Sequence, residues 1–186
     1  MTHAEGIYVW DSEGKKVLDA MSGLWCVNAG YGRKELADAA YQQMMTLPFY
    51  NSFFNTTNVP AVQLATKLAA LAPKVGGRSF EHVFFSSSGS ESNDTNVRMV
   101  RRYWDLLGQP QRKVIISRNN AYHGNTMGSM SVMGFEERKQ AFRPLIPDVD
   151  FITFNNEDDI EKITTVAAGI ILESIQGGAG FIEPQN

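Results

Sequence analysis

A run of small residues between an apolar segment and a helical pattern constrains this chain more than any other feature. Residues 82–85 are rich in β-branched and aromatic side chains, which predicts a short strand. A Ser/Gly turn follows, and from Ser90 apolar residues recur every three or four positions, which predicts a helix that ends near Gly108. Such a turn directs unpaired backbone N–H groups and the positive end of a helix dipole at one point. It therefore suits a phosphate, with Ser88 and Ser90 as hydroxyl donors.

The same turn has a simpler interpretation that needs no ligand. Serine is a preferred N-cap, so it stabilises a helix start by itself. The turn also lacks the Gly-Lys-Ser/Thr ending of a Walker-type phosphate loop. A phosphate site and a serine-capped helix are thus equally good interpretations of this segment taken alone.

Composition excludes several classes of protein. The 186 residues are 43% hydrophobic and 20% charged, as in ordinary globular proteins, and the net charge of −3 gives no footprint for nucleic acid or an anionic membrane. The single Cys26 excludes an internal disulfide framework and is typical of a reducing compartment. Neither a membrane-length apolar run nor a signal-peptide core is present. We expect a soluble, cytoplasmic protein with no nucleic-acid or membrane partner and no metal site.

The remaining pattern alternates between strands and helices. The expected elements are a hairpin over 6–20, helices over 33–47, 58–71, 136–142 and 157–164, and strands over 113–117, 151–154 and 169–172. This alternation predicts an α/β fold with a parallel sheet, whose ligands bind at the carboxyl ends of the strands. Three polar loops, 88–90, 118–124 and 173–180, follow such strand ends, so we expect them to converge.

Aromatic side chains gather in two segments outside this sheet. Trp25 lies in a loop rich in glycine and aromatic residues, and residues 49–54 form an aromatic cluster in a non-helical link. Such residues either fill a core or line a site for a flat ligand. For Trp25 the pattern alone favours the core.

In order along the chain, these residues resemble the class III aminotransferases, which are pyridoxal-phosphate enzymes of fold type I. The most similar subgroup is the ω-amino acid:pyruvate type. Six pieces carry the resemblance, in the family's order: Gly6-Ile7-Tyr8-Val9-Trp10-Asp11, Leu18-Asp19-Ala20 with Gly23-Leu24-Trp25, Gly30-Tyr31-Gly32, Ser88-Gly89-Ser90-Glu91-Ser92-Asn93-Asp94-Thr95, Tyr122-His123-Gly124, and Glu173 with its following glycines. The resemblance implies an incomplete fold type I: residues 1–47 as the N-terminal segment of the small domain, and 48–186 as a partial large, cofactor-binding domain.

The resemblance also implies a cofactor site. Gly89 and Ser90, with Ser88 beside them, would bind the phosphate of pyridoxal 5′-phosphate, as the helix start already suggests. Tyr122 would stack on the pyridine ring, and His123 would lie behind it. An ordinary buried tyrosine and a packed histidine are the alternatives for these two residues.

Further implied roles concern the cofactor edge and the substrate. Glu173 would hydrogen-bond at the cofactor edge; the alternative is a strand-end carboxylate paired with a local basic group. Trp25 would form a wall of the substrate pocket, with Phe53 and Phe54 as its neighbours. The small-molecule partners would be an amino donor and a keto acid acceptor.

Two groups that the family needs have no match in this chain. They are the Schiff-base lysine and the aspartate that holds the pyridine nitrogen protonated, both downstream of the Glu173 region in the family. None of the eight lysines stands in the matching context, and no aspartate stands in an Asp-Glu-Val setting. We expect an N-terminal portion of an aminotransferase that moves an amino group from an ω-amino acid or amine to a keto acid such as pyruvate. It is predicted to be inactive alone and homodimeric when complete.

Two alternatives belong to other classes. One is a non-catalytic remnant that binds a phosphate-bearing ligand or a partner chain. The other is a phosphate-binding domain unrelated to pyridoxal phosphate, which would show no preference for a pyridine ring.

Overall fold

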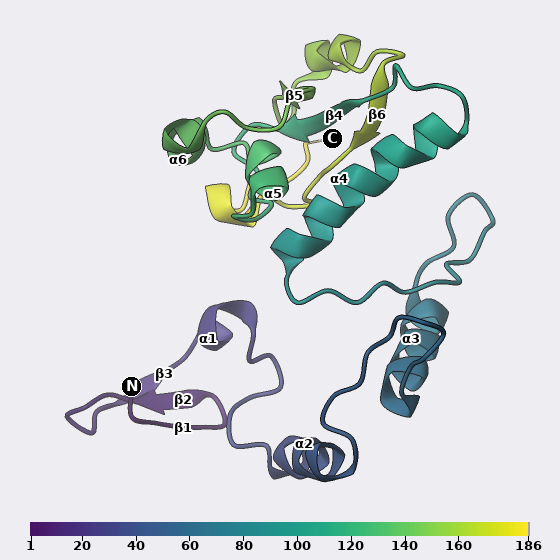
Figure 1. Cartoon of the computed structure of the whole chain (residues 1–186). Helices are drawn as coiled ribbons and strands as arrows, with labels where there is room; N and C mark the ends of the chain where they lie inside the picture. Colours follow the sequence, from purple (N-terminus) through teal and green to yellow (C-terminus); the bar gives the residue numbers. More distant parts are fainter. Residues whose placement is uncertain (186) are drawn as a thin grey trace. The chain divides into compact units, whose positions relative to one another are not determined.

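The computed structural model describes residues 1–185 and forms two compact units, Met1–Val83 and Phe84–Asn186 (Figure 1). These units are defined by how compactly each segment folds, and not by which segment belongs to the small or large domain of a family. The assignment of residues 1–47 and 48–186 to those domains therefore stays a prediction.

The first unit begins with a three-stranded antiparallel sheet. Its strands are β1 (His3–Glu5), β2 (Tyr8–Trp10) and β3 (Lys16–Leu18), in that order. The turn between β2 and β3 is held by the Asp11 carboxylate, which accepts the backbone N–H groups of Glu13 and Lys15, each at 2.9 Å. The predicted hairpin is confirmed, and β1 extends it by one strand.

Three helical segments follow: α1 (Ser22–Trp25), α2 (Lys34–Thr46) and α3 (Val59–Leu71). The predictions of α2 and α3 are confirmed. Asn58 caps α3, because its side-chain oxygen accepts the N–H of Ala61 at 3.0 Å, and Pro60 lies in the first turn, where its missing N–H costs nothing.

The apolar residues of α3 are not buried within this unit. Neither α2 nor α3 has a buried residue, and no residue of Met1–Val83 is buried by the described part of the chain. The apolar side chains Leu68 and Leu71 of α3 are both exposed. The physical reason is that an apolar helix face becomes buried only where a second layer packs on it.

The second unit has an α/β fold. Its elements are α4 (Gly89–Leu106), β4 (Val114–Arg118), α5 (Met127–Ser131), α6 (Glu136–Lys139), η1 (Gln140–Phe142), β5 (Val149–Ile152), η2 (Glu157–Lys162), β6 (Ala167–Ile170) and η3 (Gly177–Ala179). The sheet order is β5-β4-β6, and both pairings are parallel. The predicted parallel α/β sheet is confirmed. Figure 1 shows α4 lying across one face of this sheet.

The core of this unit lies between α4 and the sheet. Its buried centre consists of Val97, Ile115, Val132 and Ala168. Trp104 packs against this cluster and donates its indole N–H to the Ala168 carbonyl at 2.7 Å, so one aromatic side chain joins α4 to β6. The helix is thereby fixed on the sheet, with its first turn near the carboxyl ends of the strands.

Three strand predictions differ from the structure, one in existence and two in position. Residues 82–85 form no strand, and Phe84 is 68% exposed. A β-rich segment becomes a strand only beside a neighbour that completes its hydrogen-bond ladder, and within residues 1–185 this segment has none. The strands predicted at 151–154 and 169–172 lie two residues earlier, because β4 sets their register.

A further difference lies in the region after β4. No element is predicted between the strand over 113–117 and the helix over 136–142, but α5 forms there. Thr126 and Ser129 make a reciprocal capping box at its start.

No helix in the described range 1–185 is long and apolar enough to cross a membrane.

Gly134 provides a test of this packing. A Cβ at this position would lie 2.6 Å from the backbone nitrogen of Asn120 and 2.7 Å from that of Ala121, and backbone atoms cannot move aside. We expect Gly134→Ala to lower the free energy of unfolding by about 3 kcal/mol. Urea denaturation measures this change. Gly178→Ala is the control, because its Cβ would meet only atoms at 3.7 Å or beyond; equal effects of the two substitutions would contradict the expectation.

Candidate functional site

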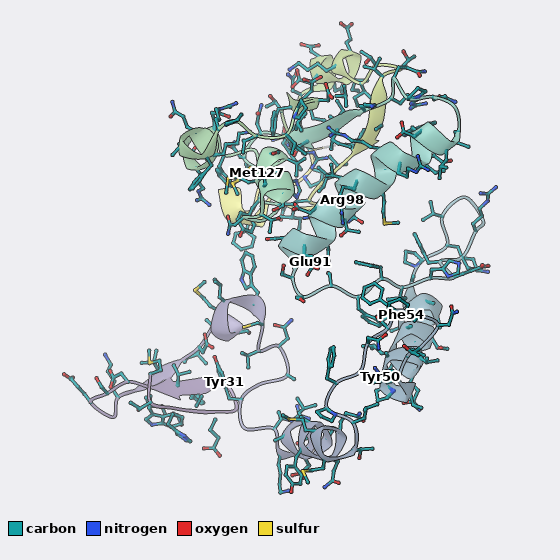
Figure 2. The ribbon with its side chains drawn as sticks, viewed as in Figure 1. Tyr31, Tyr50, Phe54, Glu91, Arg98 and Met127 are labelled. Atoms are coloured by element: carbon teal, nitrogen blue, oxygen red, sulfur yellow. The ribbon has the colours of Figure 1, made fainter. Side chains whose placement is uncertain are left out.

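The first turn of α4 leaves two backbone donors free. Ser88 caps the helix by accepting the N–H of Glu91 at 3.2 Å, and the Glu91 carboxylate accepts the N–H of Ser87 at 2.8 Å. Figure 2 shows Glu91 on this first turn. The N–H groups of Gly89 and Ser90 donate to no other residue that the structure describes. Because these donors lie at the positive end of an 18-residue helix, the turn can hold an anion.

The loop after β4 packs directly on this turn. The Ser90 hydroxyl oxygen accepts the N–H of Asn125 at 3.1 Å. Gly124 has a φ of +125°, and a Cβ there would lie 2.9 Å from the Ser90 Cα and 2.7 Å from the Ser129 hydroxyl. Only glycine permits both this conformation and this approach.

The loop after β6 reaches the same place. The Glu173 carboxylate accepts the backbone N–H of Tyr122 at 3.1 Å. Arg118 donates to the Glu173 backbone carbonyl at 2.9 Å rather than to its carboxylate. The alternative of a carboxylate paired with a local basic group is therefore not what the structure shows. All three predicted polar loops converge.

A hollow of about 340 Å³ lies where these loops meet. It is lined by Ser88, Gly89, Ser90, Asn93, Tyr122, His123 and Gly124. A Cβ on Gly89 would meet no atom within 4 Å, so the space in front of the free N–H groups is open to a ligand. Tyr122 is 42% exposed, so the described residues do not bury it.

The orientation of Tyr122 is fixed at two points. Its backbone N–H is held by Glu173, and its hydroxyl oxygen accepts the side-chain N–H of Asn125 at 3.0 Å. A rigid aromatic face held in this way suits stacking on a planar ring.

His123 is buried beside the hollow. It is 8% exposed, and its Nε2 atom has no hydrogen-bond partner among the described residues. Burial lowers the pKa of this imidazole, so it is neutral at pH 7. An unpaired polar atom in such a position is costly unless a ligand or a water pairs with it, which fits a polar ligand in the hollow.

The predicted substrate residues lie in the other unit, Met1–Val83. Trp25 is 64% exposed and Phe54 is 90% exposed, and the Phe53 and Phe54 ring centroids are 6.4 Å apart. None of the three is buried by the described residues, so the interpretation of Trp25 as a core residue is wrong for this unit. Their role in a substrate pocket stays a prediction.

Sequence patterns missed four residues that hold this site together: Asn93, Asp94, Asn125 and Thr126. Asn93 donates its side-chain N–H to the His123 carbonyl at 2.8 Å, and Asp94 accepts the Thr126 hydroxyl at 2.8 Å. The one available signal was that Asn93 stands three positions after Ser90, hence on the same side of the helix. Their partners lie about 30 residues away, beyond the reach of a local pattern.

A helix start that can hold an anion, an oriented aromatic face and a strand-end carboxylate meet at one edge of a parallel sheet, which is where α/β domains bind their ligands. The family model described as aminotransferase class-III matches residues 1–186. The chain belongs to this family, whose members have fold type I and depend on pyridoxal 5′-phosphate.

Relatives and solved structures agree with this assignment. The chain is 46% identical to a putrescine–pyruvate aminotransferase of Pseudomonas aeruginosa, with 99% of this chain and 44% of the relative covered. It is 37% identical to a mitochondrial γ-aminobutyrate transaminase of Oryza sativa, with 97% and 39% covered.

Among solved structures, an (S)-enantioselective ω-transaminase from Thermomicrobium roseum matches with a TM-score of 0.90 at 36% identity, covering 98% of this chain and 45% of that one. A transaminase from the marine bacterium Virgibacillus has the same TM-score and identity, with 100% and 44% covered. The chain thus spans less than half the length of the proteins it matches.

The buried imidazole of His123 makes stability depend on pH. Unfolding lets this group take up a proton near its ordinary pKa of 6.5, whereas the folded state resists protonation. Stability is therefore present above about pH 6.5 and falls as the pH drops below it. Depressed carboxyl pKa values, as for Glu136 and Asp159, act only in a more acidic range, below the ordinary carboxyl pKa of about 4.5.

We expect urea denaturation at pH 7.5 and 5.5 to show a loss of stability in the parent protein and a smaller loss in His123→Gln. The substitution removes the titrating group and keeps a polar side chain of comparable length. An identical loss in both proteins would show that His123 does not titrate in this range.

Proposed function

We propose that the protein carrying this chain is an aminotransferase that moves an amino group from an ω-amino acid or amine to a keto acid such as pyruvate. The observation that carries the proposal is the convergence of three polar loops on one hollow at the start of α4, in a chain of the class III family. The name of the Pseudomonas aeruginosa relative, a putrescine–pyruvate aminotransferase, supports a diamine or ω-amino donor and pyruvate as acceptor.

The residues present fit the phosphate and ring of pyridoxal 5′-phosphate. The phosphate would be held by the free N–H groups of Gly89 and Ser90 and by the hydroxyls of Ser88 and Ser90, in front of the open space at Gly89. When bound, this cofactor supplies an electron sink that lets an amino group leave one carbon skeleton and join another.

Other side chains orient the ring and the substrate. Tyr122, fixed by Glu173 and Asn125, would cover one face of the pyridine ring and exclude water from it. His123, neutral and with Nε2 unpaired, would donate to or accept from a polar group of the ligand. Trp25, Phe53 and Phe54 would supply apolar walls for the substrate.

The activity is proposed for the whole protein, since this chain spans 44% of its Pseudomonas aeruginosa relative. None of its eight lysines stands in the family's cofactor-lysine context, so we propose that the 186 residues alone are inactive. A homodimer and a cytoplasmic location complete the proposal and rest on the family resemblance and the single cysteine.

The first experiment reads the coding DNA past the codon for Asn186 and expresses the complete product. We expect an open frame that contains an Asp-Glu-Val strand end and then a lysine. The product should deaminate putrescine or a related amine only when pyruvate is added, and borohydride should fix the cofactor to that one lysine. A stop codon directly after Asn186 would favour a non-catalytic remnant.

In the same product, Tyr122→Ala should weaken pyridoxal phosphate binding about tenfold, because the stacking face is lost. Tyr41→Ala is the matched control, since Tyr41 is an exposed tyrosine on α2. Equal affinities in Tyr122→Ala and the parent protein would point to a phosphate site that does not use the pyridine ring.

A further inference from the structure

Two adjacent residues of α4 tie the 122–126 loop to the helix without occupying the first turn themselves. Asn93 and Asp94 lie one turn beyond Ser90, and both side chains reach across to segments about 30 residues away. Their hydrogen bonds join the two walls of the hollow.

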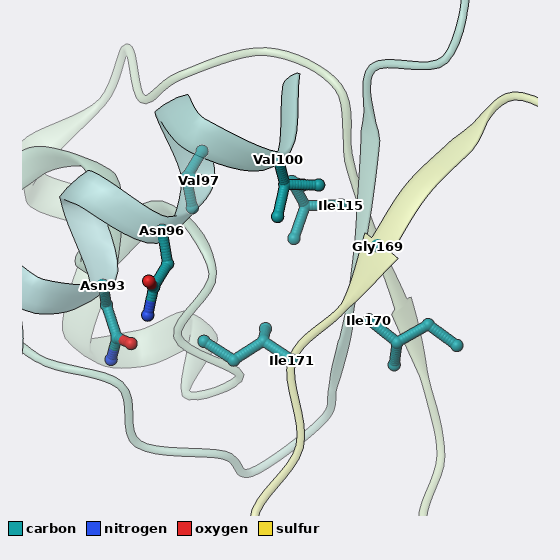
Figure 3. A pocket seen from close by; sticks show the side chains of 8 residues that line it. All are labelled: Asn93, Asn96, Val97, Val100, Ile115, Gly169, Ile170 and Ile171. Carbon is teal, nitrogen blue, oxygen red and sulfur yellow. The ribbon is translucent and has the colours of Figure 1, made fainter. Parts of the chain in front are cut away.

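Asn93 holds the middle of the loop. Its Nδ2 donates to the His123 carbonyl at 2.8 Å, directly between Tyr122 and Gly124. Figure 3 shows Asn93 and Asn96 on successive turns of α4. Asn96 has no side-chain hydrogen bond to another described residue, so the bond made by Asn93 is specific to its position and not a general property of this helix face.

Asp94 holds the end of the loop. Its Oδ1 accepts the backbone N–H of Ser129 at 2.6 Å and the Thr126 hydroxyl at 2.8 Å. These donors form the first turn of α5, where a carboxylate is favoured by the exposed N–H groups. A Cβ on Gly128 would lie 2.5 Å from this oxygen, so α5 approaches Asp94 at a point where only glycine fits.

Together these hydrogen bonds fix the position of the 122–126 loop relative to Ser90. The Thr126 hydroxyl also lies 3.2 Å from the Ser90 carbonyl, and the next residue back, Asn125, donates to the Ser90 hydroxyl. Consequently the position of Ser90 relative to Tyr122 depends on bonds at both Asn93 and Asp94. A phosphate held at Ser90 and a ring held at Tyr122 belong to one ligand of fixed length, so this spacing determines whether both can be bound together.

We propose that Asn93 and Asp94 are positioning residues that set the spacing between the phosphate-binding turn and the ring-stacking tyrosine. The inference rests on the proposed function, because it takes a phosphate-bearing pyridine as the ligand. Neither residue needs to touch that ligand: the Asn93 donor is engaged by His123, and the Asp94 oxygen is engaged by α5.

The test measures the dissociation constants of pyridoxal and of pyridoxal 5′-phosphate for the complete gene product freed of cofactor. Their ratio reports how much the phosphate adds to binding once the ring is placed. Loss of overall stability lowers both affinities together and leaves the ratio unchanged, whereas a displaced loop lowers the ratio.

Asn93→Asp should reduce the ratio about tenfold, because it sets an acceptor against the His123 carbonyl. Asp94→Ala should also reduce the ratio about tenfold. In Asp94→Asn the ratio should stay within about twofold of the parent value, because the amide oxygen still accepts the Ser129 N–H. Asn96→Ala and Asp105→Ala are the controls, being exposed positions on the same helix.

Should Asp94→Ala fail to fold, Thr126→Val replaces it, since it removes one of the two donors at Asp94 and keeps the side-chain shape. An unchanged ratio in Asn93→Asp and in the Asp94→Ala or Thr126→Val variant would overturn the inference while leaving the proposed function intact. A parent protein that binds pyridoxal and its phosphate equally well would instead overturn the proposed function, and the inference with it.

Discussion

The close contact between the 122–126 loop and the first turn of α4 is the constraint on which the site depends. At Gly124 the loop backbone comes so near to Ser90 that a Cβ would lie 2.9 Å from its Cα. This approach brings the end of β4 to the start of α4 and encloses the free N–H groups on one side. Asn125 and Thr126 then hydrogen-bond to Ser90, so the contact is held by polar atoms as well as by shape.

The helix cap leaves two backbone donors of the same turn free, so the capped turn can also hold an anion. Ser88 and Glu91 satisfy the N–H groups of residues 91 and 87, which stabilises the start of α4 without any ligand. The donors left over are those of Gly89 and Ser90, and they face the hollow. From the sequence, a serine-capped helix and a phosphate site are alternative interpretations. In the structure they do not conflict, because the cap uses the N–H groups of residues 91 and 87 and leaves those of Gly89 and Ser90.

Local patterns predicted the elements whose cause is local. The three- and four-residue spacing of Val97, Val100 and Trp104 predicts α4, and the apolar run before Ser117 predicts β4; both are confirmed. The predictions that were wrong concern features that depend on residues distant in the sequence. The strand at 82–85 needs a partner that the described chain does not place beside it, and the register of β5 is set by β4 across 30 residues. The contacts of Asn93 and Asp94 with the segment after β4 were not predicted for the same reason, because their partners are distant in the sequence.

Two hollows border α4, one polar and one mostly apolar. In the polar hollow, burial lowers the pKa of His123, and the Glu173 carboxylate holds the loop by accepting the backbone N–H of Tyr122. Beside β6, Val100, Ile115 and Ile171 line a second, mostly apolar hollow of about 260 Å³ that no described residue fills (Figure 3). Asn93 lines both hollows, so the helix that carries the polar turn also forms a wall of the apolar hollow.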